Sequence, residues 1–205
     1  MQSSERQKEI ILVAFDLISR QGIQELTIKK IALAVGISEA AIYRHFSSKV
    51  DILSSVIDEM IAQREASFRQ ARLDSSTAHQ MIRSFFTVQA RLFEEQPPFS
   101  IMLLSEDIFR NDENLLSRAR TMMGDTLNRF KGLLEEGIAE GSIQASIDCK
   151  AVALMLVGGF RLLVSAWRLE GKAEGLQVGT RRLIEGVLPL ISIQTEKPAN
   201  TGITA

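Results

Sequence analysis

The stretch LTIKKIALAVGISEAAIYRHFSSKVDIL, residues 26–53, decides the fold. Its first part has apolar residues at intervals of three and four positions, which is typical of one face of a short helix. Thr27 can cap the start of that helix, and Gly36 can turn the chain sharply after it. Ser38 can then cap a second helix that runs to about Phe46. The stretch therefore predicts two short helices joined by a tight turn.

The spacing within these two helices fits a helix-turn-helix, the motif that places its second helix in the major groove of DNA. Ala32 is small where the first helix would cross the second, Gly36 lies in the turn, and Ile42 can face back into the core. Phe46 is expected in the same core, because a phenylalanine at a helix end more often buries area than touches DNA. The second helix then leaves its small and polar side chains for another partner.

Those remaining side chains suit the edges and phosphates of a DNA duplex. An arginine can donate two hydrogen bonds to guanine, and a small apolar side chain can contact a thymine methyl group. Glu39 has two interpretations: it accepts from a cytosine amino group, or it points away because a carboxylate repels phosphate. Lys49 lies at the start of the next helix, where main-chain amides and the helix dipole favour a phosphate. The predicted DNA-binding residues are Thr27, Lys29, Lys30, Ser38, Glu39, Ala40, Ala41, Tyr43, Arg44, His45 and Lys49.

Residues from about 7 to 53 resemble the DNA-binding head of the TetR family of bacterial transcriptional regulators. The resemblance is carried by an amphipathic first helix and by Gly22, Leu26, Thr27, Ala32, Gly36, Tyr43, Phe46 and Lys49. It implies an all-α homodimer that binds a palindromic operator in double-stranded DNA. It further implies a repressor that a small-molecule effector releases, with Tyr43 at the DNA backbone. The alternative is a DNA-binding scaffold whose body recruits a protein partner.

Composition and charge agree with a helical globular protein. The 205 residues are 45% hydrophobic and 24% charged with 4 prolines, which excludes a largely disordered chain. Residues 1–50 hold seven Lys and Arg against five Asp and Glu, whereas the rest holds 17 against 20. Because the head is only mildly basic, few phosphate contacts are expected, and specificity has to come from base contacts and dimerisation.

Three domains or segments are expected along the chain. They are a helix-turn-helix head of three helices over residues 1–50, a helical effector-binding and dimerisation body over 51–194, and a disordered tail over 195–205. The body shows one helical pattern after another, at 50–73, 78–96, 99–109, 112–140, 150–170 and 178–192. The first of these helices is expected to join the head to the body. The predicted fold is therefore all-α with about nine helices.

The helix over 150–170 is apolar on nearly every side, so it has to be covered on every side. Its most apolar run, 151–160, is too short for a bilayer span of roughly 20 residues, and no secretory leader begins the chain, so a cytoplasmic protein without a membrane partner is expected. A second copy of the chain is the natural cover; the alternative is the core of a monomer. The predicted dimer interface comprises Leu154, Val157, Gly158, Arg161, Ile184, Val187, Leu188 and Ile191.

The middle helices carry aromatic and methionine side chains that could line an effector pocket. The alternative is ordinary core packing, which is the commoner role of such residues at helical spacing. The expected polar anchors are Arg91, Arg161 or His79. The predicted pocket residues are Phe85, Phe86, Arg91, Phe93, Met102, Phe109, Met123, Phe130, Arg161 and Trp167.

The chemistry needed for an enzyme is missing from the sequence. Two histidines far apart and one cysteine give no metal cluster and no nucleophile pair, and no glycine-rich phosphate loop is present. Cys149 is expected to be an inert thiol, because it has no nearby cation other than Lys150 and no resolving partner in its chain; the alternative is a redox sensor. We therefore expect no enzymatic activity, no metal site and no cofactor.

Overall fold

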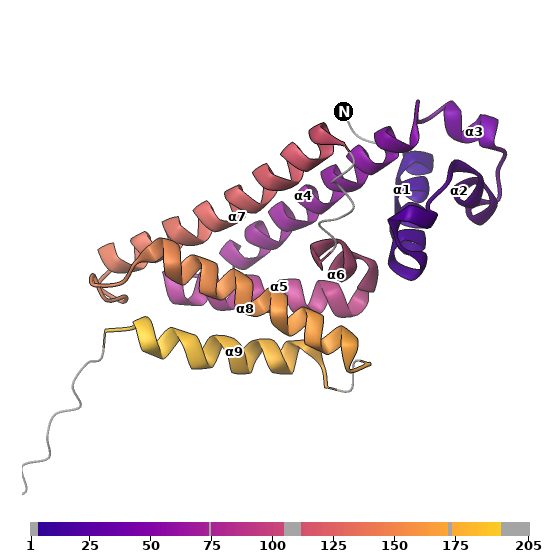
Figure 1. The fold of residues 1–205 in the computed structure, drawn as a ribbon. Coiled ribbons are helices and arrows are strands. Elements are labelled where there is room, and N and C mark those ends of the chain that lie inside the picture. Colours follow the sequence, from indigo (N-terminus) through magenta and orange to yellow (C-terminus); the bar gives the residue numbers. More distant parts are fainter. Residues whose placement is uncertain (1–3, 74, 105–111, 172–173, 194–205) are drawn as a thin grey trace, which may run out of the picture.

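The structure is a computed structural model that describes residues 4–73, 75–104, 112–171 and 174–193. In that part of the chain it has nine α-helices, one short 3-10 helix and no strand, which confirms the predicted all-α fold. The head contains α1 (Glu5–Gln21), η1 (Ile23–Glu25), α2 (Ile28–Val35) and α3 (Glu39–Tyr43). The helices that follow are α4 (Lys49–Leu73), α5 (Ala78–Glu95), α6 (Pro97–Leu104), α7 (Glu113–Ala139), α8 (Cys149–Leu169) and α9 (Leu176–Ile191). Figure 1 shows their order in space.

Side-chain caps explain where most of these helices begin. Thr27 and Ser38 accept from the main-chain N–H three residues on, as predicted, and so fix the starts of α2 and α3. Asp112 and Asp148 cap α7 and α8 in the same way. At the first helix, Ser4 takes part in a full capping box.

Three predicted boundaries differ from the structure by two residues or more, and one of them is the start of α9, at Leu176 instead of residue 178. The second short helix ends at Tyr43 instead of about Phe46, because the N–H of His45 bonds to the carbonyl of Ile42 and tightens the chain into a turn. α6 begins at Pro97, two residues before the predicted start, since a proline is tolerated in the first turn of a helix. The rest of the segment predicted as helical over 99–109, and the predicted tail over 195–205, lie outside the described residues.

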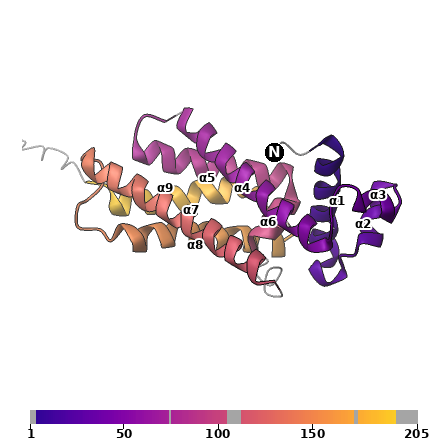
Figure 2. The ribbon, with the colours of Figure 1, turned by 90° about the horizontal axis from the view of Figure 1, so that it is seen from above.

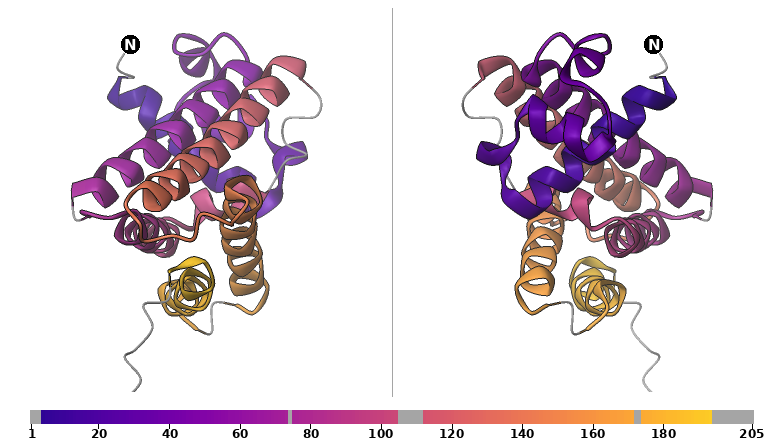
Figure 3. Two further views of the ribbon diagram at one scale, coloured as in Figure 1. Left: turned by 90° about the vertical axis from the view of Figure 1, so that its left-hand side faces the viewer. Right: turned by 90° about the vertical axis from the view of Figure 1, so that its right-hand side faces the viewer.

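The helices form a long body with the head at one end (Figure 2). α4 leaves the head and runs beside α7, and α5 lies beneath them; α9 lies on the opposite side of the body from α4 and α7 (Figures 1 and 3). The centre of the body is aromatic: Phe86 and Phe130 stack with ring centroids 4.9 Å apart, and Phe85 meets Phe130 edge-on at 5.1 Å. These rings are almost fully buried and therefore hold α5 against α7.

The head is attached to the body at two places. α1 packs against α4, as expected for a helix that joins the two parts, and it also packs against α6. The second contact centres on Phe15 of α1 and Phe99 of α6, whose ring centroids are 4.8 Å apart and whose side chains are both buried. The sequence predicted only the connection through α4.

The apolar helix α8 is mostly uncovered in the single chain. By length and composition it is the one helix in the described residues that could cross a membrane. Only 28% of its most apolar 18-residue segment is buried within the chain. Its inner side packs closely on α9, since a Cβ on Gly159 would lie 3.4 Å from Leu183 Cδ1 and a Cβ on Gly179 would lie 2.9 Å from Leu163 Cδ1. A Cβ on Gly158 would meet nothing within 4 Å. Gly159 thus allows α9 to pack close to α8 within the chain, whereas Gly158 faces outward.

Candidate DNA-binding surface

The core of the head holds α2 and α3 at a fixed crossing. Ile31, Ala32 and Ile42 are buried there, and Phe46 joins them, as the sequence predicted. Gly36 adopts a left-handed conformation with φ of 78°, which a residue with a Cβ rarely adopts, and the N–H of the next residue bonds to the carbonyl of Ala32 at 3.0 Å. The turn between the two helices is therefore built from the main chain.

One face of α3 is left open to solvent. Ser38, Glu39, Ala40, Tyr43 and Arg44 are all exposed, and 54% of Tyr43 is accessible. Large side chains in this position cannot be there for packing. The exposed face has the mixed polar and small apolar character that major-groove readers use.

Ala41 is placed differently from the prediction. It is 8% exposed and faces the core of the head, while its N–H bonds to the Ser38 side chain at 3.2 Å. Ala41 therefore lies on the inner face of α3 and not on its open face. In a helix this short, the sequence pattern alone does not separate adjacent alanines into inner and outer faces.

The two lysines at the start of α2 have different surroundings. Lys30 donates to Glu25 at 2.7 Å and to Gln21 at 3.0 Å, and the hydrogen bond to Glu25 lowers the pKa of that exposed carboxyl. Lys29 is exposed, and no ion pair joins it to a described residue. Thr27 uses its hydroxyl as the helix cap. Of these three predicted contacts, Lys29 is the one best placed to meet a phosphate.

Hydrogen bonds join the start of α4 to the rest of the head. Lys49 Nζ donates to the carbonyl of Ile23 at 3.3 Å, which pins α4 to η1. Asp51 accepts from the N–H of Ser47 at 2.9 Å, and its own N–H bonds to Ser48 Oγ at 3.1 Å. Ser48 thus caps the start of α4 while Asp51 holds Ser47, and the Ser-x-x-Asp spacing of residues 48–51 could have revealed the cap. His45 is half-buried, and its carbonyl accepts from Gln7 at 3.4 Å.

Most of the predicted effector-pocket residues line neither of the two surface hollows described below. Most of the aromatic members of this predicted set are buried and packed against one another or their neighbours: Phe85, Phe86, Phe93, Phe130 and Trp167. Met123 is exposed and Arg161 half-buried. Phe109 lies outside the described residues, and the side chain of Met102, in α6, does as well.

Two open hollows lie on the surface of the body instead. One, of about 410 Å³, lies along α5 and contains Arg91 of the predicted set together with Arg83 and Gln177. The other, of about 450 Å³, lies between α4 and α7 with part of α5 beneath. Sequence reasoning missed the second, because its lining comes from three helices and no local pattern marks it.

The predicted interface residues divide into outer and inner groups. On α8, Leu154 and Gly158 are exposed, and Val157 and Arg161 are half-buried. On α9, Val187 is half-buried, whereas Ile184, Leu188 and Ile191 are buried in the core of the chain itself. Those three side chains pack inside the chain and cannot form the surface of an interface. The uncovered apolar residues of the two helices are Leu154, Met155, Leu162, Leu169, Val178 and Leu190.

The geometry defines an all-helical protein whose N-terminal helix-turn-helix presents one exposed helix face to DNA. Residues 10–56 match the model of bacterial regulatory proteins of the tetR family, and residues 104–183 match a tetracyclin repressor-like C-terminal domain. The nucleoid occlusion factor SlmA of Haemophilus ducreyi is 33% identical over 157 residues, covering 75% of this chain and 76% of its own. The chain belongs to the TetR family of transcriptional regulators.

Two further comparisons extend over most of the chain. The HTH-type transcriptional repressor BepR of Brucella suis is 26% identical over 195 residues, or 91% of this chain and 92% of its own. The crystal structure of FadR from Bacillus subtilis in complex with stearoyl-CoA superposes with a TM-score of 0.77 at 23% identity, covering 88% of this chain and 97% of that one. At that identity, the likeness to FadR concerns the fold.

Proposed function

We propose that this protein is a homodimeric repressor that binds a palindromic operator and is released from it by a small-molecule effector. The observation that carries the proposal is the open face of α3, which is held on a rigid helix-turn-helix and exposes Tyr43 and Arg44 together. The relative BepR, a transcriptional repressor, supports repression over activation.

The DNA contacts divide by role. Arg44 and the short side chains of Ser38 and Ala40 are placed to read base edges, and Lys29 and Tyr43 to contact the backbone. Lys49 acts through position, because its hydrogen bond to Ile23 fixes the angle between α4 and the head. Ala41 has no part in this surface.

Dimerisation is supported by the uncovered apolar side of α8 and α9. A soluble monomer rarely exposes this many large apolar side chains on two neighbouring helices, and a two-fold axis would cover them with the same side chains of a second copy. Two heads would then face adjacent major grooves, about 34 Å apart along the duplex. The same burial explains α8 without a membrane and agrees with a protein of the cytoplasm.

The effector is supported by the hollows in the body and by the FadR structure, which holds stearoyl-CoA. A second candidate role follows from the SlmA relative, a nucleoid occlusion factor: a DNA-bound scaffold whose body recruits another protein. The two differ in what the body binds, since a scaffold needs no metabolite to leave DNA.

Selection of binding sites from a randomised duplex pool, at near-physiological salt, tests the proposal. We expect an inverted repeat to be enriched, with two half-sites related by the two-fold axis of the dimer. Arg44→Ala should relax one position in each half-site, whereas Arg20→Ala, which removes an exposed arginine of α1 outside the open face of α3, should select the same sites as the parent. Enrichment of a single, unrepeated half-site would contradict the dimer.

A further inference from the structure

The hollow between α4 and α7 has an apolar floor. Three apolar residues line it: Phe68, Met81 and Leu133. Each is less than a tenth exposed, so all three are fixed in place by the packing around them. Gly132 of α7 opens onto the same space, and a Cβ built on it would meet nothing within 4 Å. The hollow therefore has room at its wall as well as an apolar base. Its volume of about 450 Å³ falls in the range of small-molecule sites.

Positive charge predominates around this floor. Arg69, Arg72 and Arg129 line the hollow against two carboxylates, Glu65 and Glu136. Arg72 and Glu136 are 3.5 Å apart and both well exposed, so that pair is weak. Arg69 is exposed and makes no ion pair with a residue that the structure describes. Among the described residues, no acid therefore neutralises the charge of Arg69 in the hollow.

These arginines lie too far from the head to contact DNA. Arg72 is 23 residues beyond Lys49 on one continuous helix, which corresponds to roughly 35 Å. That distance is several times the Debye length of about 8 Å at physiological salt, so the charges contribute little to binding at the operator. The hollow is lined by α4, α7 and one residue of α5, and α9 lies on the opposite side of the body from α4 and α7 (Figure 1), so we expect the hollow to stay accessible in the proposed dimer.

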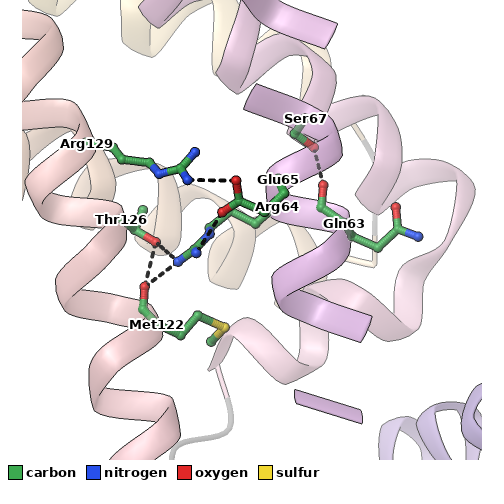
Figure 4. A network of polar contacts seen from close by, with 7 residues as sticks. All are labelled: Gln63, Arg64, Glu65, Ser67, Met122, Thr126 and Arg129. Atoms are coloured by element: carbon green, nitrogen blue, oxygen red, sulfur yellow. Dashed lines mark hydrogen bonds and ion pairs between the residues drawn. The ribbon is translucent and has the colours of Figure 1, made fainter. Parts of the chain in front are cut away.

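A chain of polar contacts leads from the hollow into the seam between α4 and α7 (Figure 4). Arg129 lies over the Phe68 ring at 4.8 Å and donates to Glu65 at 2.7 Å. The other oxygen of Glu65 accepts from Arg64 at 2.9 Å. Burial would raise the pKa of Glu65, but the hydrogen bonds from Arg64 and Arg129 outweigh it and lower the pKa. The carboxylate is therefore held charged between two arginines.

Arg64 carries that contact across to α7. Only 9% exposed, it donates to the main-chain carbonyl of Met122 at 2.6 Å and to Thr126 Oγ1 at 3.1 Å. Its Nε is buried without a hydrogen-bond partner. A buried donor left unpaired is costly, so these charges add an expensive polar contact to a seam that also holds the apolar contact between Phe68 and Phe130, whose ring centroids are 5.8 Å apart.

We propose that the hollow between α4 and α7 binds a small anionic amphiphile, with its carboxylate or phosphate among Arg69, Arg72 and Arg129 and its apolar part over Phe68, Met81 and Leu133. An anion that takes a hydrogen bond from Arg129 competes with Glu65, and Glu65 is also the partner of Arg64. Occupation of the hollow thereby alters the contact that ties α4 to α7. The use of the hollow as the effector site rests on the proposed function. Binding of the amphiphile to the hollow does not depend on that function.

The test uses the fluorescent acid 1-pyrenebutyrate and its neutral counterpart 1-pyrenebutanol, titrated into the full chain without DNA. We expect the acid to bind at least tenfold more tightly than the alcohol, as charge-assisted hydrogen bonds imply. Arg69→Gln with Arg72→Gln should abolish that preference. Arg20→Gln with Arg120→Gln, which removes two exposed arginines that line neither hollow, should leave it unchanged.

A second pair of variants tests the apolar part. Gly132→Leu should fill the hollow and weaken both probes at least tenfold without unfolding the chain, because its Cβ has open space. Gly124→Leu on the same helix, also with open space and outside the hollow, should bind both probes as the parent does. Equal binding of acid and alcohol, or undiminished binding by the Gly132→Leu chain, would overturn the proposal. Because no DNA is present, a failure here is separate from a failure to bind an operator.

Discussion

Removing one exposed leucine from α8 should weaken the dimer without harming the fold. Leu154 is 60% exposed in the single chain, and full burial of a leucine side chain contributes about 2 kcal/mol. Covering that exposed part is therefore worth about 1 kcal/mol, and most of it is lost in Leu154→Ala. A two-fold interface contains the residue twice, which makes the loss about 2 kcal/mol for the dimer. The dimer dissociation constant should rise by about 30-fold.

The assay is sedimentation velocity over a dilution series, with thermal unfolding measured on the same samples. Two leucines serve as matched controls. Leu156→Ala, on the same helix but fully buried, should lower stability by about 2 to 5 kcal/mol through the cavity it leaves. Leu33→Ala, on the exposed side of α2, should change neither stability nor dimerisation. An unchanged dissociation constant for Leu154→Ala and for Leu162→Ala would refute the argument and place the interface elsewhere.

Four further outcomes are expected. Arg44→Ala should cost about 1 to 3 kcal/mol on the selected operator and relax one base position, whereas Lys49→Ala should weaken all duplexes alike; equal losses on every sequence for both, in fluorescence anisotropy, would remove the base-reading role of Arg44. Phe15→Ala should lower the free energy of unfolding by about 3 to 5 kcal/mol in chemical unfolding, because it removes the ring contact with Phe99 and leaves a cavity. A loss below about 1 kcal/mol would show that α4 alone holds the head. Burial lowers the pKa of His79 from its ordinary 6.5, so the unfolded chain takes up a proton before the folded chain does, and the free energy of unfolding falls as the pH drops below about 6.5. In His79→Gln, the free energy of unfolding should depend less on pH in this range. The same pH dependence in the variant and the parent would assign the effect to other groups. Saturating 1-pyrenebutyrate should weaken operator binding at least fivefold in the parent chain but not in Gly132→Leu, and equal weakening in both would separate the hollow from regulation.

Local chemistry allowed much of the fold to be predicted. Thr27, Ser38, Asp112 and Asp148 each begin a helix by a hydrogen bond to a residue two or three positions on, and such short-range contacts are visible in the sequence. Gly36 likewise marks a left-handed turn that its neighbours require. The helix-turn-helix follows from these features and one apolar stripe, which is why the order of residues was enough to predict it.

The remaining features depend on contacts between distant segments. The bond from Lys49 to the Ile23 carbonyl joins residues 26 positions apart, and the seam from Arg64 to Met122 joins residues 58 apart. Likewise, Ile184 and Leu188 have the apolar character of an interface but face the inside, since an apolar helix face does not reveal which neighbour covers it. The hollow between α4 and α7 was missed for the same reason. Among the phenylalanines predicted to line a pocket, the four in the described residues are buried in the core: Phe85, Phe86, Phe93 and Phe130.

The double attachment of the head, through α4 and through the ring pair of Phe15 and Phe99, has a mechanical consequence. Fixed at two points, the head cannot swivel on its own and follows every rotation of the body. The 25 residues of α4 extend about 37 Å, so a tilt of about 5° at the far end displaces the head by about 3 Å. Successive base pairs are separated by about 3.4 Å along the duplex. A tilt that small in each subunit shifts the reading helices by nearly one base pair relative to their half-sites, enough to put both out of register at once.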